Sequence, residues 1–214
     1  CPPSRAPTSS RSVSERILYL VRHAESDFGS SDFRAGVRGD QWDPPLGERG
    51  REQARLLAGR LRAMPMPAAV YSSPLRRARE TVAAFADPSG VEVVVDDDLA
   101  EAYLGDWEGK PFEEILSTDE QMLHRIRNQE PIWRHAPGVE DLGPFRARVR
   151  DAVERILSTH PTGNVLVVCH GAVINAYVAP LLGVDHEMFF VPENTSLNSV
   201  VVDGSLRRVR FLND

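Results

Sequence analysis

Two histidines stand at matching places in this sequence. His23 follows an apolar run in ILYLVRHA, and His170 follows another in NVLVVCHG, each just before a small residue. Both runs contain the β-branched residues typical of strands covered on both faces of a parallel sheet. A single histidine is most often a hydrogen-bonded core residue, but two at equivalent strand ends, one of them beside Arg22, indicate a shared site. If both strands are parallel and central, the side chains emerge at the sheet edge where such sheets bind ligands.

An imidazole beside arginines suits phosphoryl transfer. The attacking nitrogen of His23 needs its lone pair, so we expect the other ring nitrogen to donate to a backbone carbonyl. Arginines and the second histidine would then hold the phosphoryl oxygens. We expect neither a metal nor another cofactor, because Arg22 and further arginines can supply the charge that Mg²⁺ supplies elsewhere. The six histidines also show no HxxxH or HxH spacing.

Four segments together resemble the histidine phosphatase superfamily, whose fold is that of phosphoglycerate mutase. They are LVRHAES, SSPLRRARET, LAEAYLGDWEG and VVCHGAVI, they occur in the family's order, and the resemblance runs from about residue 17 to the C-terminus. It implies that His23 is the phosphorylated nucleophile and that Arg22 binds phosphate beside it. It also implies that Glu101 is the general acid and base, and that His170 is the second histidine of the catalytic, phosphate-binding site.

The resemblance also singles out one of two adjacent arginines. Helical periodicity does not choose between Arg76 and Arg77 as the phosphate ligand, because neither lies on the apolar face of its predicted helix. The family pattern implies Arg77.

One position departs from the family pattern. Gly29 stands six residues after the nucleophile, where relatives often carry asparagine. One phosphate contact is therefore missing unless Ser26 or Ser30 replaces it.

Predicted strands and helices alternate along the chain, which indicates an α/β fold. We expect Ser73 to cap a helix whose first residue is Pro74. The resemblance sharpens the prediction to a three-layer α/β/α sandwich around a mostly parallel, mixed sheet of the phosphoglycerate mutase type. The expected strands cover 17–22, 68–73, 91–96, 164–171, 196–204 and 207–214, and the expected helices cover 48–61, 74–86, 145–157 and 172–183.

Composition defines three segments. Residues 1–14, rich in Pro and Ser, are predicted to be a disordered leader, and residues 15–214 a single phosphatase domain. Residues from about 117 to 139 show no clear period and are expected to form an insertion, or lid, over one end of the sheet. The insertion carries basic side chains that either favour a polyanionic substrate or form an ordinary polar surface: His124, Arg125, Arg127, Arg134 and His135.

Charge and hydropathy exclude several classes of partner. The formal net charge of −6 argues against general nucleic-acid binding. No apolar run approaches the roughly 18 residues that a membrane helix needs. Cys1 and Cys169 are not expected to form a disulfide. We expect a cytoplasmic protein that acts on a small phosphorylated substrate. A leader that begins at Cys1 is also compatible with a processed form or a lipoprotein. The sequence is compatible with a homodimer as well.

The sequence therefore predicts a metal-independent phosphomonoesterase of the histidine phosphatase type. The first alternative is a phosphoglycerate mutase-type phosphoryl transferase, although GDWEG after Glu101 looks more like the phosphatase branch. The second alternative is a non-catalytic module that binds a phosphorylated ligand. A cysteine phosphatase is excluded, because Asn175 rather than arginine stands six residues after Cys169.

Overall fold

A six-stranded mixed sheet forms the centre of the computed structural model, which describes residues 15–36, 39–118, 121–128, 130, 132 and 135–214. The predicted leader, Cys1 and Arg134 lie outside the described residues. The strand order is β5-β4-β6-β1-β7-β8. The strands are β1 (Arg16–Arg22), β4 (Ala69–Ser72), β5 (Val93–Val95), β6 (Val165–Cys169), β7 (Leu197–Asp203) and β8 (Leu206–Phe211).

The sheet is parallel on one side and antiparallel on the other. Strand β6 pairs in parallel with both β1 and β4, and β4 pairs in parallel with β5. Strand β7 then runs antiparallel to β1, and β8 antiparallel to β7. The predicted mixed and mostly parallel sheet is thus confirmed, and the strands that precede His23 and His170 are neighbours near its centre.

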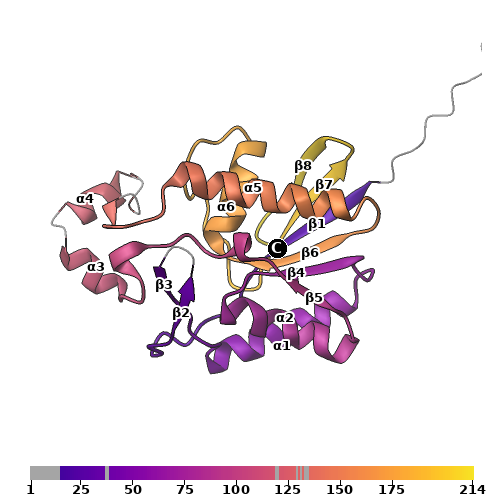
Figure 1. Ribbon diagram of the computed structural model, residues 1–214, viewed down its shortest axis with the longest axis horizontal. Helices are drawn as coiled ribbons and strands as arrows, with labels where there is room; N and C mark the ends of the chain where they lie inside the picture. Colours follow the sequence, from indigo (N-terminus) through magenta and orange to yellow (C-terminus); the bar gives the residue numbers. More distant parts are fainter. Residues whose placement is uncertain (1–14, 37–38, 119–120, 129, 131, 133–134) are drawn as a thin grey trace, which may run out of the picture.

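Four long helices cover the two faces of this sheet (Figure 1). Helices α1 (Glu48–Arg62) and α2 (Arg76–Ser89) pack on one face, and α5 (Leu142–Thr159) and α6 (Gly171–Leu181) pack on the other. Because β1 and β6 contribute side chains to the apolar clusters on both faces, they carry the continuous apolar runs seen in the sequence. The three-layer sandwich is confirmed.

Several boundaries differ from the sequence-based expectation, among them those of the strand expected at 91–96 and of helix α2. The strand expected at 91–96 is restricted to Val93–Val95 at the sheet edge. Helix α2 begins at Arg76 with Leu75 as its N-cap, so the prediction that Ser73 caps a helix starting at Pro74 was wrong. The Ser73 hydroxyl does accept a hydrogen bond from Leu75 N at 3.2 Å, but it does so in a turn before the helix.

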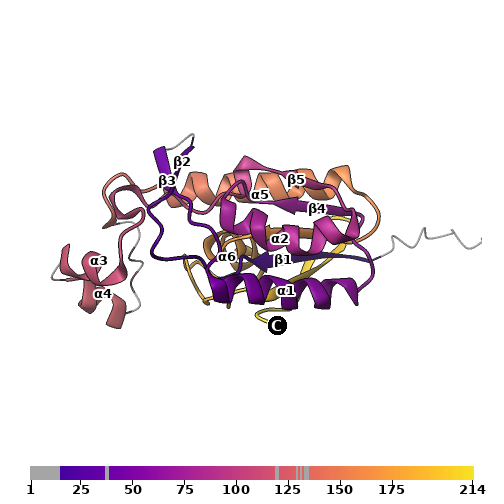
Figure 2. The ribbon, with the colours of Figure 1, turned by 90° about the horizontal axis from the view of Figure 1, so that it is seen from below.

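A smaller group of elements lies beyond one end of the sheet (Figures 1 and 2). It contains the hairpin β2 (Phe33–Gly36) and β3 (Gly39–Trp42), and the short helices α3 (Phe112–Thr118) and α4 (Met122–Arg127). Its apolar cluster contains Trp107, Ile115, Met122 and Ala136. Within the described residues, no helix is long and apolar enough to cross a membrane.

Candidate active site

His23 is placed by the backbone of the central strands. Its amide donates to the carbonyl of Cys169 at 2.9 Å, and its own carbonyl accepts the side-chain amide of Asn194 at 2.9 Å. The ring Nδ1 lies 2.7 Å from the carbonyl oxygen of Ala24. A carbonyl can only accept, so Nδ1 carries the proton and Nε2 keeps its lone pair. This is the arrangement that nucleophilic attack requires.

The surroundings of His23 keep its ring neutral. Burial, followed by the positive charges of Arg77 and Arg22, holds the pKa of His23 well below its ordinary value, although the bond to Ala24 opposes this shift. Since a charged imidazole loses hydration on burial, the neutral form is favoured. His23 is therefore an available nucleophile at neutral pH.

The loop after His23 is supported from behind by α1. A Cβ built on Gly50 would lie 1.9 Å from the carbonyl oxygen of Glu25, so only glycine permits this approach. The amide of Ala24 also donates to the Thr81 hydroxyl of α2 at 2.9 Å. Both helices on this face thus help to fix the loop.

His170 follows β6, beside the end of β1. The rings of His23 and His170 lie 5.0 Å apart between centroids. The Nε2 atom of His170 is 2.6 Å from the Ser73 hydroxyl, while its Nδ1 is buried without a hydrogen-bond partner among the described residues. Burial, followed by the charge of Arg77, holds the pKa of His170 well below its ordinary value. When the Ser73 hydroxyl donates to Nε2, the unpartnered Nδ1 carries the ring proton and can donate it in a hydrogen bond to a bound anion.

Ser73 is a site residue that the sequence analysis missed in this role. It directly follows β4, and its amide donates to Val168 of β6 at 2.9 Å. Ser73, His170 and His23 therefore follow the carboxyl ends of three adjacent parallel strands. The same strand-end argument that identified the histidines could have found Ser73 in AAVYSS, had its hydroxyl not been assigned to a helix cap.

Two arginines bring positive charge to this edge. Arg22 donates through Nη1 to the carbonyl of Pro192 at 2.5 Å, and its buried Nε has no hydrogen-bond partner among the described residues. Arg77 is only 7% exposed and donates through Nη1 to the carbonyl of Trp42 at 3.0 Å. Arg76 instead lies at the surface in an ion pair with Glu80 at 2.7 Å. Helical periodicity did not show whether Arg76 or Arg77 faces the site. The structure places Arg77 at the site and Arg76 at the surface.

Glu101 lies on the loop between the short 3-10 helices Asp97–Leu99 and Gly105–Trp107. Its two carboxylate oxygens accept the backbone amides of Ala102 at 3.0 Å and Ala172 at 3.2 Å. Burial raises the pKa of Glu101, although these two amides and the charges of Arg77 and Arg22 oppose the shift. A raised pKa favours the protonated carboxyl, which is the form that can donate a proton.

Two other carboxylates lie near the site. Glu108 resembles Glu101 in that both of its oxygens accept backbone amides, from Trp42 at 2.9 Å and from Leu104 at 2.8 Å, and burial raises its pKa as well. Glu25 forms an ion pair with the exposed Arg49 at 3.4 Å. Glu101 differs from both because its charge interacts with Arg22 as well as Arg77. The structure therefore brings together the five residues that the family resemblance implied.

A cavity of about 80 Å³ borders the Glu101 loop. Ala102 and Ala172, whose amides hold the Glu101 carboxylate, form part of its wall. The remaining lining residues are apolar or acidic: Val139, Leu142, Phe145, Glu140, Asp141 and Glu187.

The expectation that Ser26 or Ser30 replaces the family asparagine as a phosphate contact stays a prediction.

Comparisons with known proteins agree with this geometry. A family model described as "Histidine phosphatase superfamily (branch 1)" matches residues 18–214. Phosphoserine phosphatase 1 of Hydrogenobacter thermophilus is 34% identical over 173 residues, which cover 81% of this chain and 79% of that protein. The structure of mycobacterial glucosyl-3-phosphoglycerate phosphatase is similar at a TM-score of 0.76 and 27% identity, covering 93% of this chain and 99% of the other. A phosphoglycerate mutase of Bacillus anthracis is similar at a TM-score of 0.69 and 25% identity, over 94% and 93% of the two chains.

Proposed function

The chain belongs to the histidine phosphatase superfamily and is a phosphatase-type hydrolase, and we propose that it cleaves phosphomonoesters through a phosphohistidine on His23. The observation that carries this proposal is the bond from Nδ1 of His23 to the carbonyl of Ala24 at 2.7 Å. It leaves Nε2 unprotonated, and the lowered pKa keeps the ring neutral. Nε2 then attacks the phosphorus atom.

The buried donors around His23 are the proposed phosphate ligands. Arg22 Nε is a buried donor and His170 Nδ1 a buried ring nitrogen, and neither has a protein partner in the described part of the chain. Nδ1 of His170 donates to phosphate in the tautomer in which Nε2 accepts from the Ser73 hydroxyl. A Cβ at Gly171 would lie 3.9 Å from Arg22 Nε, so the glycine keeps the space beside that donor open. Arg77 adds a second guanidinium. These fixed donors stabilise the charge of the transferring phosphoryl group without having to reorganise.

Glu101 is proposed to handle the protons of both half-reactions. As the P–O bond of the ester breaks and the N–P bond forms, the Glu101 carboxyl donates its proton to the leaving oxygen. In the second step the Glu101 carboxylate takes a proton from water, and the water oxygen attacks phosphorus. The N–P bond breaks, its electron pair returns to His23 Nε2, and phosphate is released.

The organic part of the ester is proposed to lie on the Glu101 side of the site. The cavity beside the Glu101 loop supports this placement, because its wall includes the two residues that hold the acid. The apolar side chains of its lining can pack against carbon atoms of the leaving group, and the carboxylates of Asp141 and Glu187 can bind hydroxyl or ammonium groups.

The proposal is tested by trapping the intermediate. Enzyme quenched during turnover of ³²P-labelled substrate should carry a label that is labile in acid and stable in alkali, on a peptide that contains His23. His23→Ala should lose both the label and turnover. His160→Ala is the control, because His160 bonds Tyr71 at 2.9 Å away from the site and should retain both. Turnover of His23→Ala at the wild-type rate would refute the proposal.

A further inference from the structure

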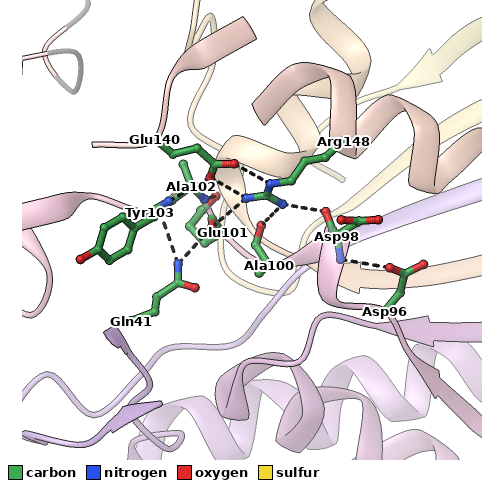
Figure 3. Close-up of polar contacts among 9 residues, drawn as sticks. All are labelled: Gln41, Asp96, Asp98, Ala100, Glu101, Ala102, Tyr103, Glu140 and Arg148. Carbon is green, nitrogen blue, oxygen red and sulfur yellow. Dashed lines mark hydrogen bonds and ion pairs between the residues drawn. The ribbon is translucent and has the colours of Figure 1, made fainter. Parts of the chain in front are cut away.

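Arg148 uses every one of its hydrogen-bond donors around the Glu101 loop (Figure 3). Its Nη1 donates to the carbonyls of Asp98 at 2.7 Å and Ala100 at 2.9 Å, and its Nη2 donates to the carbonyl of Glu101 at 3.2 Å. The two remaining donors bind both oxygens of Glu140, at 2.7 and 2.8 Å. A guanidinium has five N–H donors, so all of them are satisfied.

The ion pair between Arg148 and Glu140 is buried. Their side chains are 8% and 6% exposed, and the Arg148 guanidinium lies 4.7 Å from the ring centre of Phe145. Glu140 also binds the loop directly, because its amide donates to the Tyr103 carbonyl at 2.9 Å and its side chain accepts the Tyr103 amide at 3.3 Å. The pair therefore holds the loop on both sides of Glu101.

Gln41 of β3 approaches the same loop from the hairpin (Figure 3). Its Nε2 donates to the Glu101 carbonyl at 3.0 Å and lies 3.5 Å from the Ala102 carbonyl. The Glu101 carbonyl thus accepts from α5 and from the hairpin. Residues 98–103 contain no strand and only the last turn of a 3-10 helix, so these side chains replace the support that regular structure gives elsewhere.

We propose that Arg148, Glu140 and Gln41 are positioning residues that hold Glu101 where it donates its proton to the leaving group. The inference rests on the proposed role of Glu101 as the acid and adds the residues through which its position is fixed. Arg148 and Glu140 do not touch the reacting atoms in this account; they act through the backbone of residues 98–103. A displacement of about 1 Å in such a group can cost about 100-fold in rate.

Lysine cannot replace Arg148 in this role, because its ammonium is a point charge that cannot span two carboxylate oxygens and three carbonyls. In Arg148→Lys, we expect the single-turnover rate of phosphoenzyme formation from an alkyl phosphate to fall about 10- to 100-fold. With p-nitrophenyl phosphate, whose leaving group needs no proton, the rate should stay within about 2-fold of wild type. Arg150→Lys is the matched control, because Arg150 lies on the same helix and pairs at the surface with Asp151.

Gln41→Ala provides a second variant that leaves the buried ion pair intact. It should show the same selective loss with alkyl phosphate, smaller in size, at about 3- to 10-fold, since one hydrogen-bonding side chain is removed. Asp40→Ala is its control, because Asp40 is exposed on the same strand. If Arg148→Lys proves unfolded by circular dichroism, Gln41→Ala tests whether side chains that hold the loop position Glu101.

A double-mutant cycle separates this inference from the proposed function. In a Glu101→Gln background, Arg148→Lys should cost no more than about 2-fold further, because the acid through which Arg148 acts is already gone. Equal losses with both substrates, or fully additive losses in the cycle, would overturn the positioning role. If instead Glu101→Gln itself slows both substrates equally, the assignment of the acid fails.

Discussion

The two sides of this active site are held in place by different parts of the fold. His23, His170 and Ser73 follow adjacent strands, so the hydrogen-bond ladder of the sheet fixes their backbone. Glu101 lies on a loop that is fixed by three side chains from other elements. The phosphate side therefore shares its rigidity with the whole core, whereas the leaving-group side depends on a few contacts that a single substitution can remove.

This difference suits the two tasks of a phosphatase. Every phosphomonoester carries the same phosphoryl group, so its ligands can be fixed by the central parallel strands, at whose carboxyl ends α/β sheets bind ligands. The alcohol differs between substrates, and Glu101, its proposed proton donor, lies on a loop that borders a cavity. We infer that loops and the outer elements around α3 and α4 can change with the substrate while the sheet edge stays the same.

A large effect is expected on the phosphate side. Arg77→Ala should slow phosphoenzyme formation about 100- to 1,000-fold with alkyl and aryl phosphates alike, because a buried cation on the phosphoryl group is lost. Its neighbour provides the control. Arg76→Ala, which removes an exposed pair with Glu80, should stay within about 2-fold of wild type. A larger loss in Arg76→Ala than in Arg77→Ala would reverse the assignment.

A smaller effect is expected from the support of His170. Ser73→Ala removes the hydroxyl 2.6 Å from Nε2 of His170, and should slow phosphorylation by both substrate types about 3- to 10-fold. Ser72→Ala is the matched control, since that buried hydroxyl donates to the Ser73 carbonyl at 2.9 Å instead. A loss with alkyl phosphates alone would show that Ser73 acts on the leaving group, and would contradict its assignment to the phosphate side.

The smallest expected change is in the pH profile of the phosphate side. Attack requires neutral His23, so the rate is lost only as pH falls through its folded pKa, which burial and Arg77 hold well below 6.5. The single-turnover rate with p-nitrophenyl phosphate should therefore not fall as the pH is lowered from neutral to 6.5. A rate that is halved near pH 6.5 would show that the His23 ring titrates as an ordinary histidine.

The two sides also differ in what the sequence could predict. Continuous apolar runs predicted the central strands, and the parallel arrangement placed His23 and His170 together, as the structure confirms for the fold. Family motifs implied Arg22, Arg77 and Glu101, which the structure brings to the same edge. Their catalytic roles stay predictions.

The support of Glu101 could not be predicted in the same way. Arg148 lies 47 residues after the carbonyl that it binds, and Gln41 lies 60 residues before it. Neither belongs to a motif, and Arg148 is one of several arginines in FRARVRDAVER, all of which look like surface residues by type. Only tertiary packing shows that Arg148 is buried. The helix-capping rule likewise failed to predict the role of Ser73. Its hydroxyl accepts the Leu75 amide, as a cap would, but it also bonds His170, which is distant in the sequence.

The central claim is that phosphate binding and proton donation to the leaving group depend on different residues. Its most direct test compares Glu101→Gln with Arg77→Ala on two substrates. Single-turnover phosphoenzyme formation is measured with an alkyl phosphate and with p-nitrophenyl phosphate, because steady-state turnover could be limited by the water step. Glu101→Gln should slow the alkyl phosphate about 100- to 10,000-fold and leave the nitrophenyl phosphate nearly unchanged, while Arg77→Ala slows both. Equal losses for the two substrates in Glu101→Gln would contradict the separation of phosphate side and leaving-group side.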